Sequence, residues 1–106
     1  MSASHDTWDA FLVEHYRPGL TAVELGTWAA RLRAKACELE RETNSVRYVG
    51  ATIVPTDESM LCMFEAVSEQ HVRDVYSSAE IPFERITVVV PDAAWSEWPQ
   101  SRKEEE

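Results

Sequence analysis

The sequence has little glycine, few basic residues and no long apolar run. Only 3 of its 106 residues are glycine and 44% are apolar, which is not the composition of a disordered chain. Its 10 lysines and arginines are outnumbered by 19 aspartates and glutamates, for a net charge of -9. This balance disfavours nucleic acid and anionic lipid as partners. Since no apolar run approaches the ~20 residues of a membrane span and no signal-peptide pattern is present, we expect a cytoplasmic protein.

Motifs of nucleophilic and metal chemistry are also missing. The 2 cysteines, Cys37 and Cys62, have no CxxC spacing, so we interpret both as buried free thiols. The 3 histidines (His5, His15 and His71) form no HxH, HxxxH or HExxH motif. A glycine-rich phosphate loop and a GxSxG elbow are absent, which disfavours a nucleophilic hydrolase.

Two helices are predicted. Thr21 and Glu24 have capping-box spacing, and apolar residues then recur at helical intervals until "TNS" (residues 43–45) ends the pattern. The buried stripe of this helix is expected to contain Leu25, Trp28, Ala29, Leu32, Ala36 and Leu39. Ser68 is expected to cap a second helix that Pro82 stops, with a buried side formed by Val72, Val75, Tyr76 and Ala79.

Four strands are predicted over residues 10–16, 46–54, 60–66 and 85–90, from their β-branched and aromatic content and flanking turn residues. The order βαββαβ predicts a ferredoxin-like α+β fold, with a four-stranded antiparallel sheet and both helices on one face. We expect one domain over residues 10–91, preceded by a flexible leader (1–9) and followed by an arm and charged tail (92–106).

Alternation of side chains divides the strands into two faces. Beneath the helices we expect Phe11, Val13, His15, Val46, Tyr48, Gly50, Thr52, Val54, Met60, Cys62, Phe64, Ile86, Val88 and Val90. On the helix-free face we expect Leu12, Glu14, Tyr16, Arg47, Val49, Ala51, Ile53, Leu61, Met63, Glu65, Arg85, Thr87 and Val89. The neighbours Glu14 and His15 then face opposite sides and are not a catalytic dyad.

The helix-free face is too apolar to stay uncovered on a soluble monomer. We therefore expect a homodimer that packs sheet to sheet, a dimeric α+β barrel with a partly polar cavity between the sheets.

Four charged residues are expected in that cavity: Glu14, Glu65, Arg47 and Arg85. Apolar walls raise a carboxyl pKa and an arginine lowers it, so these residues form either a tuned acid/base and anion-binding group or ordinary cross-strand ion pairs. Tyr16 and Tyr48 either donate phenolic protons at the cavity rim or pack. The two glutamates would suit a hard cation or a weak metal site.

Several stretches resemble a known family: "FLVEHYRPGLT", the first helix, "VRYVGATIVPTDESMLCMFEAVS" and "IPFERITVVV". They are similar to the domain-of-unknown-function family DUF4242, small actinobacterial proteins that are sometimes labelled nickel-binding. The resemblance covers about residues 11–91, and its most specific pieces are the strand before "PGLT" and the "CMFEA-x-S" junction. It implies a ferredoxin-like fold, a dimer and a divalent metal, nickel.

The same comparison identifies departures from the family. When the "GLT" pieces are superposed, the strand histidines expected in nickel-binding relatives fall on Glu14 and Arg47, and His15 lies one place away. An arginine is not a metal ligand at neutral pH. Glu65 matches the family pattern at its junction and is the first residue to which a family role would transfer.

Three functions remain open from the sequence. A small dimeric binding protein would hold a divalent metal or a small molecule through Glu14, Glu65, Arg47 and Tyr16, and otherwise needs no cofactor. A cofactor-independent oxygenase, cyclase or isomerase would use Glu14 or Glu65 as general base and Arg47 to hold an enolate or carboxylate, by analogy of fold only. A structural protein would dock Trp95 and Trp98 of its arm on a partner.

Overall fold

The structure is a computed structural model that describes residues 8–90. Its elements follow the expected order: β1 (Asp9–Tyr16), α2 (Ala22–Thr43), β2 (Val46–Val54), a 3-10 turn η1 (Pro55–Asp57), β3 (Ser59–Ala66), α3 (Glu69–Ala79) and β4 (Arg85–Val89). Trp95 and Trp98 lie outside the described residues. Neither helix combines the length and apolar character needed to cross a bilayer, among the residues described.

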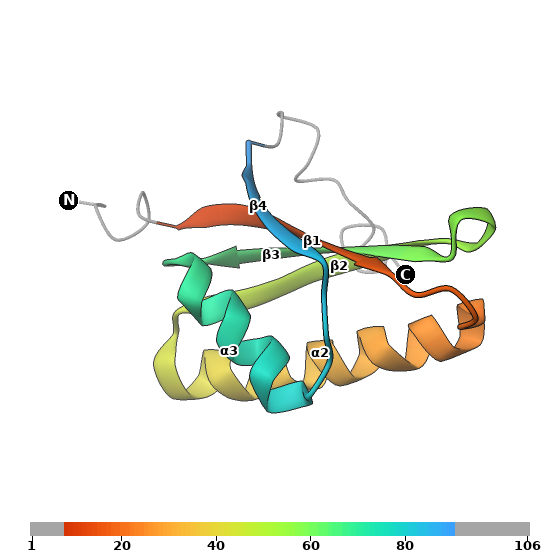
Figure 1. Ribbon diagram of the computed structural model, residues 1–106. Coiled ribbons are helices and arrows are strands. Elements are labelled where there is room, and N and C mark those ends of the chain that lie inside the picture. Colours follow the sequence, from red (N-terminus) through yellow and green to blue (C-terminus); the bar gives the residue numbers. More distant parts are fainter. Residues whose placement is uncertain (1–7, 91–106) are drawn as a thin grey trace, which may run out of the picture.

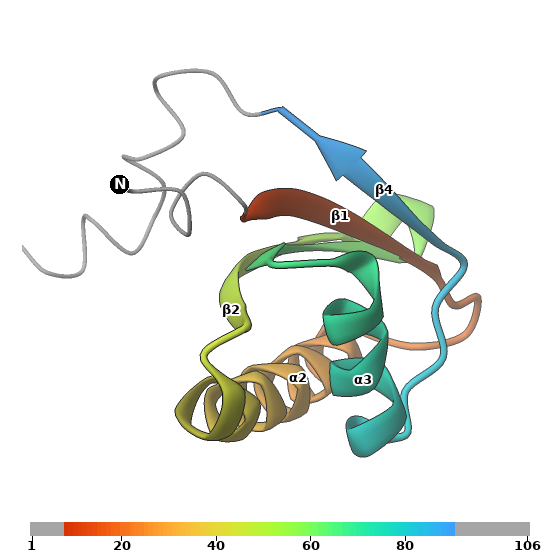
Figure 2. The same cartoon turned by 90° about the vertical axis from the view of Figure 1, so that its left-hand side faces the viewer.

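The four strands form one antiparallel sheet in the order β2-β3-β1-β4. β1 and β3 occupy the centre, and β2 and β4 form the edges. Figures 1 and 2 show α2 and α3 on the same side of this sheet, so the molecule has two layers. The ferredoxin-like α+β fold predicted from the element order is confirmed.

Local capping sets the bounds of α2. The Thr21 hydroxyl accepts a hydrogen bond from the Glu24 backbone N–H at 3.1 Å, and the Glu24 carboxylate accepts one from the Thr21 N–H at 2.8 Å. At the other end Asn44 takes the left-handed conformation (φ 52°), and its N–H bonds the Glu40 carbonyl. The predicted capping box is therefore confirmed, and the most buried residues of the stripe are Leu25, Leu32 and Ala36.

The second helix differs from its prediction at both ends. Ser68 occupies the N-cap position, but its hydroxyl bonds His71 Nδ1 at 2.9 Å instead of a backbone N–H. The helix ends at Ala79, ahead of Pro82, because Glu80 adopts the left-handed conformation with φ 59°. The predicted buried side is confirmed. Arg31 of α2 donates a hydrogen bond to the Ala79 carbonyl and so ties the two helices together.

A β-bulge in β2 overturns part of the predicted division between faces. Tyr48 pairs with Phe64 and Gly50 pairs with the next residue along β3, Met63, so Val49 is an extra residue. An extra residue reverses the alternation beyond it. The prediction is therefore wrong for the second half of β2: Ala51 and Ile53 pack on the core, whereas Gly50, Thr52 and Val54 share the side of Met63 and Leu61.

The two cysteines have different environments. Cys62 is fully buried on β3, and burial raises the pKa of its thiol to about 12. Cys37 on α2 is exposed, so its predicted burial is wrong. Cys37 directly follows the buried Ala36, and one residue turns the helix by about 100°, so its side chain points to solvent. Val90, predicted at the end of the last strand, follows β4 and is 95% exposed.

Replacement of Leu32 by alanine should destabilise the protein by about 2–5 kcal/mol, because Leu32 is completely buried between α2 and the sheet. Val23→Ala in the same helix is the control: this side chain is 78% exposed, and the change should stay within about 0.5 kcal/mol. Urea unfolding monitored by circular dichroism measures both. Equal losses in the two variants would contradict the assignment of the buried side.

Candidate functional site

The sheet face opposite α2 and α3, called the open face below, is the candidate site. Neither helix covers it (Figure 1). Strand pairing places on it Ala10, Leu12, Glu14, Arg47, Gly50, Thr52, Val54, Leu61, Met63, Glu65, Arg85, Thr87 and Val89. Leu12, Leu61 and Met63 are half-buried on the two central strands and form an apolar strip. Glu14 and Glu65 share this face, as predicted.

One charged pair lies at the junction of β1 and β4. Glu14 and Arg85 are directly opposite each other, and Arg85 Nε and Nη2 both donate to Glu14 Oε2, at 2.9 and 2.7 Å. Arg85 is 69% exposed, so solvent screens the attraction. A pair of this kind contributes about 0.2–1 kcal/mol to stability. Its main consequence is that the Glu14 carboxylate, predicted from the sequence as a possible general base, is bound by Arg85.

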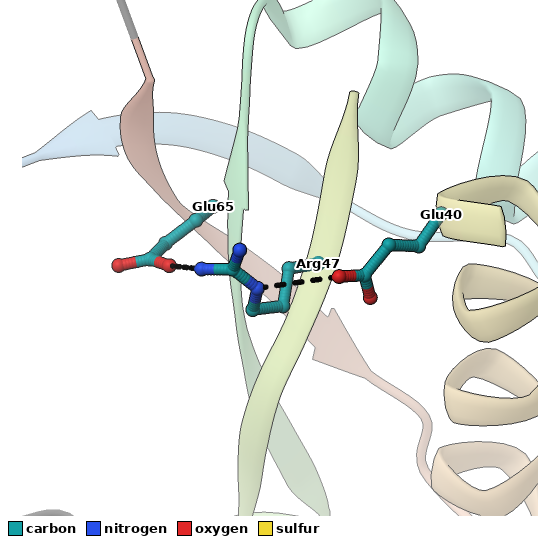
Figure 3. A network of polar contacts seen from close by, with 3 residues as sticks. All are labelled: Glu40, Arg47 and Glu65. Atoms are coloured by element: carbon teal, nitrogen blue, oxygen red, sulfur yellow. Dashed lines mark hydrogen bonds and ion pairs between the residues drawn. The ribbon is translucent and has the colours of Figure 1, made fainter. Parts of the chain in front are cut away.

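A second group of charges surrounds Arg47 at the edge strand β2. Figure 3 shows the Arg47 guanidinium between two carboxylates: Nη1 donates to Glu65 at 2.8 Å, and Nε donates to Glu40 of α2 at 3.5 Å. The Arg47 Cζ also lies 5.1 Å from the centroid of the Trp8 ring, within the range of a cation–π contact. Arg47 therefore links the open face to the C-terminal part of α2.

The two charged groups do not form one centre. Glu14 lies opposite Leu61, whereas Glu65 lies opposite Ala10, four residues further along the same strand pair. At about 3.3 Å per residue, this offset separates the two positions by about 13 Å. Of the two interpretations left open by the sequence, these contacts favour cross-strand ion pairs. A general-base role for Glu14 or Glu65 stays a prediction.

The two tyrosines named as ligand-binding residues lie apart. Tyr16 ends β1 with an exposed side chain, and its backbone N–H bonds Glu84 Oε1 at 2.8 Å. Tyr48 faces the helix side, where its ring packs edge-on against Phe64 with centroids 5.5 Å apart. Burial raises the pKa of the Tyr48 hydroxyl. Tyr48 is thus separated from Arg47 and Arg85 by the sheet itself.

His15 faces the core, one of the two placements that the sequence allowed. It is 1% exposed, its Nδ1 lies 3.0 Å from the Met60 carbonyl oxygen, and its ring packs against Tyr76. Burial lowers the His15 pKa more than the contact with Met60 and the nearby Glu84 carboxylate raise it. His15 Nε2 and the Tyr76 hydroxyl are both buried without a hydrogen-bond partner in the described structure.

No group of three or more His, Cys, Asp or Glu side chains within residues 8–90 is arranged to hold a metal ion. His71 is occupied by Ser68, and His5 lies outside the described residues. Sequence analysis missed Trp8 and Glu40 as neighbours of Arg47. Trp8 was detectable, since it continues the alternation of Ala10 and Leu12, but the contact of Glu40 depends on how α2 passes the edge of the sheet.

A protein-family model described as "Nickel responsive protein SCO4226-like" matches residues 11–89. Among solved structures, the chain is similar to the crystal structure of SCO4226 from Streptomyces coelicolor A3(2), with 22% identity and a TM-score of 0.61. That similarity covers 79% of this chain and 99% of the other, and at this identity it supports the fold alone. A search of curated proteins found no match.

The buried His15 predicts that the protein becomes less stable as the pH falls. Its pKa in the folded state is lowered, so below pH ~6.5 the unfolded chain binds more protons and unfolding becomes easier. The difference in unfolding free energy between the wild type and His15→Gln should therefore shrink as the pH falls from about 7.5 to 5.5. Urea titrations of both proteins across this range measure it. A difference that does not change with pH would contradict the prediction.

Proposed function

The chain belongs to the SCO4226-like family of nickel-responsive proteins, and we propose that it is a homodimeric binding protein that encloses a small organic molecule between two open faces. The family-level resemblance identified from the sequence is confirmed, whereas the name DUF4242 and an actinobacterial source stay predictions. The family description is compatible with metal binding.

The apolar strip of the open face carries the proposal. Leu12, Leu61 and Met63 lie on adjacent central strands and are left half-buried, with neither α2 nor α3 over them. Full burial of side chains of this size is worth about 1.5–3 kcal/mol each relative to exposure. A second copy offers the same strip, and a two-fold pairing of identical patches is the usual geometry of a homodimer.

The charges around the strip are compatible with being covered. Glu14 is neutralised by Arg85, and Glu65 by Arg47, so closing a second sheet over them would bury paired rather than isolated charges. The remaining negative charge of Glu40 belongs to α2, at the edge of the face. An apolar centre with a charged rim is the common composition of a protein interface.

Gly50, which has no side chain, argues for a ligand between the sheets. It lies beside Met63 on the open face, so the surface is uneven there. We infer that two such faces would leave room for a ligand at this position. A small molecule with an apolar body and polar ends would contact the strip with its body and the two ion pairs with its ends.

Nickel does not fit the described side chains of one chain. Imidazole groups suit nickel, but the described residues of the open face include no histidine. The two carboxylates of this face, Glu14 and Glu65, are each paired with an arginine and lie about 13 Å apart. His15 and Cys62 are buried on the other side of the sheet. We therefore do not assign the predicted metal role to Glu14 and Glu65.

Native mass spectrometry of freshly purified protein tests the proposal. We expect a dimer that carries a small-molecule adduct, which unfolding releases. Met63→Lys, in the middle of the strip, should weaken dimerisation on the order of 100-fold or more, because it buries a charge without a partner. Val23→Lys, on the exposed side of α2, should leave the dimer intact. A wild-type monomer at about 0.1 mM would end the dimer proposal, and a dimer without any adduct would end the ligand part.

A nickel titration tests the treatment of the open-face carboxylates. Calorimetry should give the same Ni²⁺ affinity for the wild type and for the double variant Glu14→Gln, Glu65→Gln, within about twofold, because arginines already occupy both carboxylates. Loss of a tight Ni²⁺ site in the double variant, but not in the surface control Glu42→Gln, would instead assign the metal to the open face.

A further inference from the structure

A hollow of about 200 Å³ lies between α2 and the edge strand β2. It is on the helix side of the sheet and is therefore separate from the open face. Its walls are Gly26, Ala29, Ala30 and Arg33 of α2 and Tyr48 of β2. The first three supply an apolar surface, and the other two supply a guanidinium and a phenolic hydroxyl.

The guanidinium of Arg33 is not engaged elsewhere in the described structure. Arg33 is exposed and forms no ion pair with any residue between 8 and 90. The positions three and four residues away on the same helix hold three alanines and Cys37, so no carboxylate faces it along α2. Among residues 8–90 nothing occupies its guanidinium, which can therefore donate hydrogen bonds to an anion.

Tyr48 lines the same hollow and carries a phenolic hydroxyl that can donate a hydrogen bond. Its ring is packed edge-on against Phe64, which limits its motion. Tyr48 and Arg33 both line the hollow, and burial raises the pKa of the Tyr48 hydroxyl. Because burial dominates, the hydroxyl stays protonated and can donate.

Gly26 supplies an independent observation. Glycine destabilises the interior of a helix relative to alanine, and α2 runs unbroken through this position. A Cβ built on Gly26 meets no atom within 4 Å in the described part of the chain, and its backbone is not in the left-handed region. Neither packing nor conformation therefore requires glycine here. Glycine leaves bare backbone on this wall of the hollow.

We propose that this hollow binds a small organic monocarboxylate. The carboxylate accepts hydrogen bonds from the Arg33 fork and from the Tyr48 hydroxyl. The apolar body of the ligand lies against Ala29, Ala30 and the bare backbone at Gly26. The hollow is smaller than the ~300–1,000 Å³ of drug-sized pockets, so the ligand is a fragment the size of benzoate, with a Kd on the order of millimolar.

Titration of the ¹⁵N-labelled full-length protein with benzoate tests the site by amide chemical shifts. We expect saturable shifts centred on residues 26–33 and 47–49. Arg33→Gln should weaken benzoate binding at least ~10-fold, and Tyr48→Phe, which keeps the ring, about 3–5-fold. Lys35→Gln removes the same charge from another side of α2 and should change nothing. Benzamide, which has the same shape without the charge, should bind at least ~10-fold more weakly than benzoate.

Gly26→Ala separates a ligand site from a structural glycine. The new methyl group would cover the bare backbone on one wall of the hollow without touching the described chain, so benzoate affinity should fall while the urea midpoint rises. A lower midpoint with unchanged affinity would overturn the role given to Gly26. Absence of saturable shifts, or full affinity in Arg33→Gln, would overturn the site. Inorganic phosphate that binds as well as benzoate would overturn the choice of an organic carboxylate.

Discussion

Burial of one face of the sheet by α2 and α3 is the constraint on which the rest of this structure depends. Phe11, Val13, Met60 and Phe64 of the central strands are covered by the buried sides of the two helices. Both α2 and α3 lie on the same side, so neither of them covers the opposite face. The apolar strip, the cross-strand ion pairs and the proposed dimer all follow from this asymmetry.

Arginine determines what the open face can do chemically. Arg85 and Arg47 each hold a glutamate that would otherwise be available as a base or a metal ligand. A guanidinium is permanently charged and cannot coordinate a cation. A chain of a nickel-responsive family thus presents, over the residues described, a face suited to paired charges and apolar contacts. The fold is shared with the SCO4226 structure, while the chemistry belongs to individual side chains.

The bulge at Val49 shows how one inserted residue redistributes a surface. It turns Ile53 into the core and places Gly50 and Thr52 on the open face, which makes that face smaller in side-chain volume and more polar than alternation predicts. The same strand presents Tyr48 to the hollow beside α2 on one side and Arg47 to the open face on the other. Strand β2 therefore contributes to both proposed sites.

The sequence by itself determined the elements and their order, because caps, helical spacing and strand alternation are local: Thr21 with Glu24 starts α2, and the buried side of α3 follows from its spacing. It also placed Glu14 and Glu65 on one face. Only the tertiary structure decided that these glutamates lie about 13 Å apart and are held by different arginines, since the pairing of strands joins residues far apart in the chain. The position of Val49 as a bulge and the contact of Arg47 with Glu40 were undecided for the same reason: both depend on how β2 lies against β3 and α2.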